Sequence, residues 1–306
     1  MKTRRLVSLL AVLILAVTAL PAFASHGWST YHWSRSCGTC PKSLTIYNTT
    51  VATSRANWPD HLYKSVFGDP NNPNSANRLG WNDSAVLTLS ITASSASRST
   101  CDPVAGAVRV CNYPYGTNGW LGLAQIWLSS GHISQGTTKV NDTYFNSSYP
   151  VTEQRHVMCQ EVGHDFGLGH TSENGSSQNT CMDYYGNTSN SDWTSTGPNS
   201  HDFTQLEVQH HWGTSNLVDD ATWITDALTE SARVPAFLVG VEVDEPWQWG
   251  TPIEFNAEGT PTTYFLKLGP NHDDHNNGIL THVYPVRKTV RDEPLDAAPA
   301  PEVVQP

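Results

Sequence analysis

The chain has 306 residues and a formal net charge of −11, with 17 Lys and Arg side chains against 28 Asp and Glu. An acidic chain without a basic cluster is not expected to bind nucleic acid or an anionic membrane. Its length is enough for one sizeable domain and an appendage, and we expect a monomer.

Residues 1–24 have the pattern of a secretory signal peptide. Three cations precede an apolar run over 6–20, and the small residues Ala22 and Ala24 predict cleavage before Ser25. The apolar run is short for a membrane span, and no later segment approaches the necessary length. The expected protein is therefore secreted and extracellular.

The six cysteines are an even number in a chain that we expect to be exported, which favours three disulfides. Six cysteines allow 15 pairings, and the sequence alone does not choose among them. The Cys37–Cys40 spacing also occurs in redox pairs, but no strand leads into this segment, so a structural bridge is favoured. Nearness in the chain suggests the pairs Cys37 with Cys40, Cys101 with Cys111, and Cys159 with Cys181.

The first half of the chain is expected to form a sheet. Runs of β-branched, aromatic and aliphatic residues predict strands at 43–47, 84–92, 107–110, 119–128 and 137–144. A short helix is predicted to begin near Pro59. Both faces of the strand at 119–128 are largely apolar, which is typical of a strand packed on two sides or lining a cleft.

A helix is predicted over 153–166, with Thr152 as its cap. Met158, Val162 and Phe166 recur at i, i+4 and i+8 and form an apolar stripe for the core.

Gln160 and His164 lie opposite this stripe, on a face expected to look into a cleft. Gly167 can adopt the left-handed conformation that ends a helix, so the chain can turn there and bring His170 back beside His164. Two imidazoles and the carboxylate of Glu161 would then meet at one point.

The stretch from Gln160 to His170, QEVGHDFGLGH, resembles the metzincin zinc-protease signature HExxHxxGxxH, with Gln160 in place of the first histidine. A methionine turn around Met182 follows it. The resemblance implies one catalytic zinc ion held by His164 and His170, with Glu161 as general base. Gln160 would offer its amide oxygen as a weaker third ligand, and Met182 would form an apolar floor beneath the metal.

The resemblance also implies an α+β fold in which a twisted mixed β-sheet packs on the active-site helix. A smaller subdomain with the Met turn and a helix starting near Ser200 would follow. Leu121, Gly122, Leu123 and Ala124 would belong to an edge strand along which an extended protein or peptide substrate binds. Nothing in the sequence indicates a structural calcium ion. In matrixin propeptides a cysteine blocks the zinc ion and keeps the enzyme latent. Only about a dozen residues separate the expected cleavage site from Cys37, too few for a propeptide domain, so we do not expect Cys37 to have this role.

We expect the metzincin-like domain to span 25–216, a small β-rich appendage 217–291 and a disordered tail 292–306. Strands are predicted in the appendage at 238–243, 263–268 and 279–286. Residues 272–275, with the sequence HDDH, are expected to form a polar turn rather than a metal site.

The function implied is a secreted zinc endopeptidase of matrixin-like type. The alternative is a pseudo-protease, in which Gln160 weakens the metal site and the domain binds a peptide or protein without cutting it.

Overall fold

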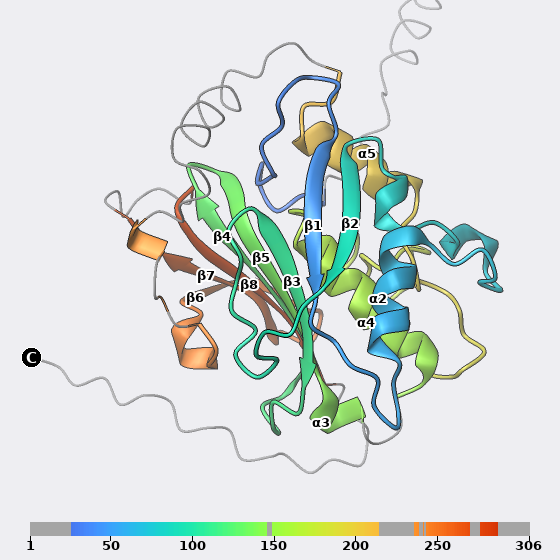
Figure 1. Ribbon diagram of the computed structural model, residues 1–306. Helices are drawn as coiled ribbons and strands as arrows, with labels where there is room; N and C mark the ends of the chain where they lie inside the picture. Colours follow the sequence, from blue (N-terminus) through green and yellow to red (C-terminus); the bar gives the residue numbers. More distant parts are fainter. Residues whose placement is uncertain are drawn as a thin grey trace, which may run out of the picture.

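The computed structural model describes residues 26–145, 149–213, 236–238, 241, 243–269 and 276–286. A mixed eight-stranded sheet forms its centre, and α2 and α4 pack together on one face (Figure 1). The α-helices are α2 Trp58–Phe67, α3 Asp142–Phe145, α4 Val151–His164 and α5 Ser200–Gln209. The strands are β1 Lys42–Asn48, β2 Leu87–Ala93, β3 Ala107–Tyr113, β4 Trp120–Ser129, β5 His132–Asn141, β6 Thr251–Phe255, β7 Pro261–Lys267 and β8 Gly278–Pro285.

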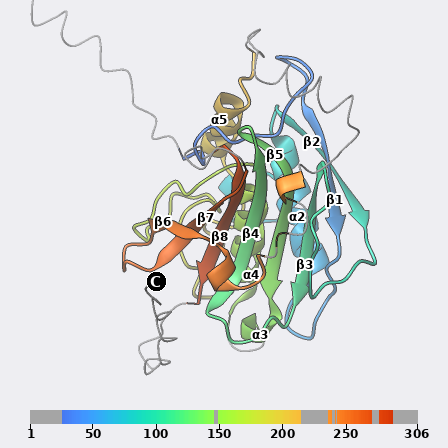
Figure 2. The ribbon, with the colours of Figure 1, turned by 90° about the vertical axis from the view of Figure 1, so that its left-hand side faces the viewer.

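The strands follow one another across the sheet in the order β2-β1-β3-β5-β4-β8-β7-β6. The first four in this order are mutually parallel, whereas β4, β8, β7 and β6 pair antiparallel (Figure 2). The chain is thus α+β, as expected, and its C-terminal strands extend the same sheet.

The expectation of a separate C-terminal appendage is not met. β8 pairs along most of β4, and Phe265, Leu280 and Tyr284 belong to the same buried cluster as the residues of α4. The physical reason is that β4 is buried on both faces and still needs a hydrogen-bonding partner on the side away from β5. The C-terminal segment supplies that partner.

The side chains of β8 alternate between two cores. Leu280 and Tyr284 face the helical side of the sheet, whereas Ile279 and Val283 join a second cluster on the opposite face. That second cluster also contains Trp120, Leu123, Trp127, Leu238, Val243 and Trp249. His282 has the parity of Leu280 and Tyr284, so its side chain points toward α4.

Three buried tryptophans anchor the elements around α4. The indole N–H of Trp81 donates to Cys159 O (3.1 Å), that of Trp33 to Asp165 O (2.8 Å), and that of Trp58 to Asp142 Oδ1 (2.7 Å). Each indole buries a large apolar surface while its single donor is satisfied.

Several element boundaries differ from the sequence expectation. α4 begins at Val151, and Thr152 lies within it, where its hydroxyl donates to Ser189 O (2.7 Å) instead of capping the helix. β5 begins at His132, and 142–145 form a helical turn, while β6 had not been anticipated. Residues 1–25, 214–235, 270–275 and 287–306 lie outside the described part of the chain, with the signal peptide, the HDDH segment and the tail.

The three disulfides predicted from nearness in the chain are present: Cys37–Cys40, Cys101–Cys111 and Cys159–Cys181. They are compatible with a secreted protein, because such bonds persist in oxidising compartments. In the described part of the chain, no helix combines the length and apolar character needed to cross a membrane.

The pairing of β8 with β4 leads to a first prediction. A chain ending after Gly213 would lose β6–β8 and expose the buried apolar edge of β4, which favours aggregation. We expect this truncated protein to be insoluble or to lack a cooperative thermal transition in circular dichroism. A truncated protein with the same melting temperature as the full chain would show that the C-terminal strands are dispensable for folding.

A second prediction concerns His61, which packs against Trp58 and whose Nε2–H donates to Gln154 Oε1 (3.1 Å). Burial lowers its pKa from 6.5 to about 4, against a hydrogen bond with Gln154 that raises it. Since the unfolded chain binds the proton more readily, the stability from neutral His61 is complete above pH 6.5 and is lost as the pH falls toward 4.

When the pH is lowered from 7 to 5, protonation of His61 should reduce the free energy of unfolding by about 2 kcal/mol. Urea unfolding at both pH values, in a buffer with chelator, should show a correspondingly smaller loss for His61→Gln than for the natural protein. Equal losses in the two proteins would mean that His61 does not titrate in this way.

Candidate metal centre

Helix α4 and the turn that follows it bring two imidazoles together, as the sequence predicts. The helix ends at His164, and Gly167 adopts a positive φ of 90° that reverses the chain. A side chain at Gly167 would collide with the carbonyl of Tyr31, so both the turn and the packing require glycine. As a result, Nε2 of His164 lies 3.1 Å from Nε2 of His170.

A third imidazole comes from β8. His282 lies directly opposite Ala124 of β4, and cross-strand partners project from the same face of a sheet. Its ring lies 3.9 Å from that of His164 and 4.7 Å from that of His170, measured between centroids. One nitrogen of each of the three histidines lies within 4.8 Å of the others.

The far nitrogen of each ring is held by an acceptor from a different element. His164 Nδ1–H donates to Leu168 O (2.7 Å), His170 Nδ1–H to Glu173 Oε1 (2.5 Å), and His282 Nδ1–H to Glu161 Oε2 (2.9 Å). A neutral imidazole that donates through Nδ1 carries a lone pair on Nε2. The lone pairs of His164 and His170 therefore lie close together, with that of His282 nearby, and a hydrogen bond through the other ring nitrogen is typical of metal-bound histidines.

Electrostatics favour a cation between these nitrogens. Two lone pairs 3.1 Å apart repel unless a positive charge lies between them, and His282 Nε2 is buried without a hydrogen-bond partner. Tetrahedral zinc with Zn–N bonds of about 2.0–2.1 Å separates its nitrogen ligands by about 3.3 Å. The three-imidazole donor set and the 3.1 Å between the nitrogens of His164 and His170 thus fit a zinc ion, and His282 lies within reach of the same point.

Burial keeps the imidazoles of His164 and His282 neutral. Burial is the main cause that lowers the pKa of His164 and of His282 well below the ordinary value, and the neighbouring imidazoles add to it. Neutral imidazole is the form that binds a metal, so burial keeps these two side chains in that form even in mildly acidic solution.

Glu161 lies beneath the cluster with none of its surface exposed. Its Oε2 accepts from His282, whereas Oε1 is buried without a partner. Burial, and then the nearby Asp165, raise the pKa of this carboxyl well above its usual range. Glu161 packs against Gly122 of β4, where a Cβ atom would come within 2.8 Å of both its Cγ and Oε1.

The sequence predicts that Gln160 faces a cleft, but in the structure its side chain points into the protein interior. It is fully buried, and its amide nitrogen donates to Cys181 O (2.9 Å) and Asp183 O (2.7 Å), so it ties α4 to the Met turn. Its Oε1 is buried without a hydrogen-bond partner. The Cys159–Cys181 disulfide joins the same two segments.

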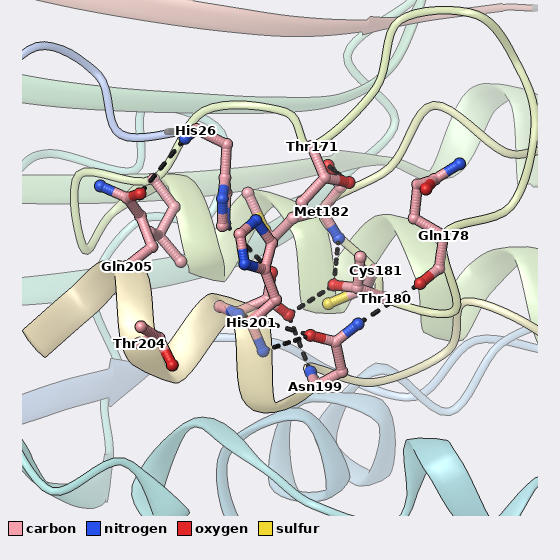
Figure 3. Close-up of polar contacts among 12 residues, drawn as sticks. His26, Thr171, Gln178, Thr180, Cys181, Met182, Asn199, His201, Thr204 and Gln205 are labelled. Carbon is pink, nitrogen blue, oxygen red and sulfur yellow. Dashed lines mark hydrogen bonds and ion pairs between the residues drawn. The ribbon is translucent and has the colours of Figure 1, made fainter. Parts of the chain in front are cut away.

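The Met turn is fixed by polar contacts from three segments (Figure 3). Met182 O accepts from Thr171 N (2.8 Å), and Met182 N donates to Thr180 Oγ1 (3.0 Å). The Thr180 hydroxyl in turn donates to Asp202 of α5 (2.5 Å). The N-terminal segment docks onto the same helix, where His26 N donates to Gln205 Oε1 (3.3 Å).

Aromatic rings enclose the cluster. Trp28 stacks on His164 with centroids 4.5 Å apart, and Tyr184 meets His170 edge to face at 5.1 Å. Such rings limit the access of water and hold the imidazoles in place. His170 also lines a cavity of ≈ 360 Å³ that lies beside the cluster.

The expectation that Leu121–Ala124 lie in an edge strand is wrong. β4 pairs with β5 on one side and with β8 on the other, and all four residues are buried. Because the C-terminal strands occupy the second side of β4, an extended peptide has no free backbone groups there to pair with.

His282 is the functional candidate that sequence reasoning missed. The strand that carries it was predicted. Leu280, His282 and Tyr284 alternate with their neighbours and so share one face of that strand, which is the signal that could have drawn attention to His282. Sequence periodicity does not reveal which distant strand is the partner, so it could not bring His282 to His164.

The comparisons with known proteins give no identity. No protein-family model matches the chain, and no curated protein is recognisably similar to it in sequence.

The contact between Glu161 and Gly122 yields a third prediction. Gly122→Ala would displace Glu161 and with it the acceptor of His282, and outer-shell changes of this kind typically cost roughly 10–100-fold in metal affinity. Zinc affinity can be measured by competition with a chromophoric chelator. Thr88→Ala serves as the control, because this side chain is exposed on β2, at the edge of the sheet away from β4 and β8. Equal affinities for the two variants would contradict the prediction.

Proposed function

We propose that the protein is a secreted zinc-dependent endopeptidase in which His164, His170 and His282 hold the metal. The observation that carries this proposal is the convergence of three imidazoles, each with its Nδ1 hydrogen-bonded to an acceptor. Three nitrogen ligands leave a fourth position for a water molecule or a substrate oxygen, as catalytic zinc sites require.

A bound zinc ion would supply Lewis acidity toward a peptide carbonyl and acidify a water in the fourth position. The chain's own contribution is a carboxylate that can move the proton. Glu161 Oε2 is held by His282, while Oε1 has no partner and can accept a proton from water and pass it to the leaving amine. Glu161 therefore acts as a base and also positions a ligand.

In this proposal Gln160 is not needed to complete the ligand set. Its amide nitrogen spans two carbonyls of the Met turn, a role that imidazole, with its single free N–H in the neutral form, could not fill in the same way. Gln160 thus holds the turn that carries Met182 against α4, while His282 supplies the third nitrogen.

A second candidate function is a zinc-containing module that binds peptides without cutting them. It is favoured by the occupied edge of β4 and by the complete burial of His164, Glu161 and His282. The two candidates share the metal site and differ in turnover, so one set of variants separates them.

The fourth prediction compares His282→Ala, Gln160→Ala and Glu161→Ala in the full-length protein. Zinc content by elemental analysis and hydrolysis of casein, with and without chelator, are the measurements. We expect one zinc ion per natural chain, a loss of zinc affinity in His282→Ala beyond the roughly 100-fold typical of outer-shell changes, and a clearly smaller loss in Gln160→Ala. Glu161→Ala should abolish hydrolysis.

Zinc retained by His282→Ala and lost from Gln160→Ala would contradict this ligand assignment. Stoichiometric zinc without hydrolysis of any protein or peptide substrate would favour the binding module instead.

A further inference from the structure

The cavity beside the cluster of His164, His170 and His282 is lined by acidic, imidazole and apolar groups. It is bounded by the N-terminal segment, the turn that carries His170, and the end of β6. Since His170 belongs both to the imidazole cluster and to the cavity wall, a group in the cavity lies next to the metal site. The lining residues are His26, Gly27, Gly169, His170, Glu173, Glu254 and Phe255.

Two carboxylates from distant parts of the chain meet at this cavity. Glu173 uses Oε1 to accept from His170, while its Oε2 is buried without a hydrogen-bond partner. The Glu173 side chain as a whole is 35 % exposed, so its charge is accessible from the cavity, and a cation there would satisfy this oxygen.

The second carboxylate is directed by an irregularity in β6. The register between β6 and β7 shifts between Pro252 and Glu254, so Ile253 is an additional residue on the β6 side. Bulges of this kind reorient a side chain. Glu254 thereby pairs with Thr263, whose hydroxyl donates to Glu254 Oε2 (2.6 Å), and it lines the cavity.

The remaining wall suits the aliphatic stem of a cationic side chain. Phe255 lies next to the two carboxylates and is 50 % exposed, so its ring offers an apolar face to a ligand. Lys and Arg place their methylene groups against such a face and their charge against carboxylates. Among the residues that the structure describes, neither Lys nor Arg lines the cavity, and Nε2 of His26 lies 3.1 Å from Asp202 Oδ1.

We propose that this cavity takes a Lys or Arg side chain of a peptide that lies across the metal cluster, with Glu254 as the residue that sets this preference. The proposal rests on the proposed function, because it names the substrate class of the same site. The same chemistry is present in free cations such as lysine amide, which the experiment separates from a peptide.

The experiment measures binding, so that it does not depend on cleavage. Fluorescein-labelled peptides that differ only in Lys, Gln or Glu at one position are titrated with the full chain in chelator-containing buffer and followed by anisotropy. We expect the Lys peptide to bind about tenfold more tightly than the Gln peptide, as for a hydrogen bond to a charged group, and the Glu peptide to bind weakest.

Glu254→Gln keeps an acceptor for Thr263 and should reduce the preference for Lys to within about twofold of Gln. Glu258→Gln is the matched control, because it removes the same charge from an exposed turn outside the cavity lining and should leave the preference unchanged. Lysine amide should compete only at concentrations far above those of the peptide.

Equal binding of the three peptides, or equal effects of the two Glu→Gln variants, would overturn the proposal. Competition by lysine amide as strong as by the peptide would overturn its peptide part. If the Lys peptide binds most tightly but the zinc-loaded protein hydrolyses none of the peptides, the result counts against the endopeptidase proposal alone. If the zinc-loaded protein hydrolyses the peptides without a preference for Lys, the result counts against the cavity proposal alone.

Discussion

The antiparallel pairing of β8 with β4 is the interaction on which the candidate site depends. It places His282 opposite Ala124, on the face that packs against α4. Because side chains alternate along a strand, a slip of one residue would turn His282 into the second core and bring Thr281 or Val283 to Glu161 instead. The register is fixed by burial on both faces, with Leu280 and Tyr284 in one core and Ile279 and Val283 in the other.

The same pairing creates a polar site in a dry interior. Tyr284 donates to Glu153 Oε1 (3.2 Å) and His282 donates to Glu161, two residues that lie eight positions apart on one face of α4. Strand and helix are thus joined by polar contacts at two successive levels. Among the described residues there, His282 Nε2, Glu161 Oε1 and Gln160 Oε1 are buried without a hydrogen-bond partner. A metal ion with its bound water is the kind of group that satisfies buried atoms of this type.

Local patterns in the sequence predicted the elements that depend on neighbouring residues. The helix carrying His164, the reversal at Gly167 and the three disulfides between nearby cysteines all follow from short-range spacing. The pairing of β4 with β8 does not follow from short-range spacing, since strand pairing across more than 150 residues leaves no local signal. The resemblance to metzincins placed β4 at an edge, where the C-terminal segment of this chain adds three strands.

The central claim is that three imidazoles, one of them from β8, surround the metal. X-ray absorption at the zinc edge of the zinc-loaded full chain tests it most directly, because the fine structure counts imidazole ligands and gives their distances. We expect three imidazoles at about 2.0–2.1 Å and one light oxygen ligand, and two imidazoles after His282→Ala. A natural protein with only two imidazoles and additional oxygen ligands, unchanged by His282→Ala, would contradict it.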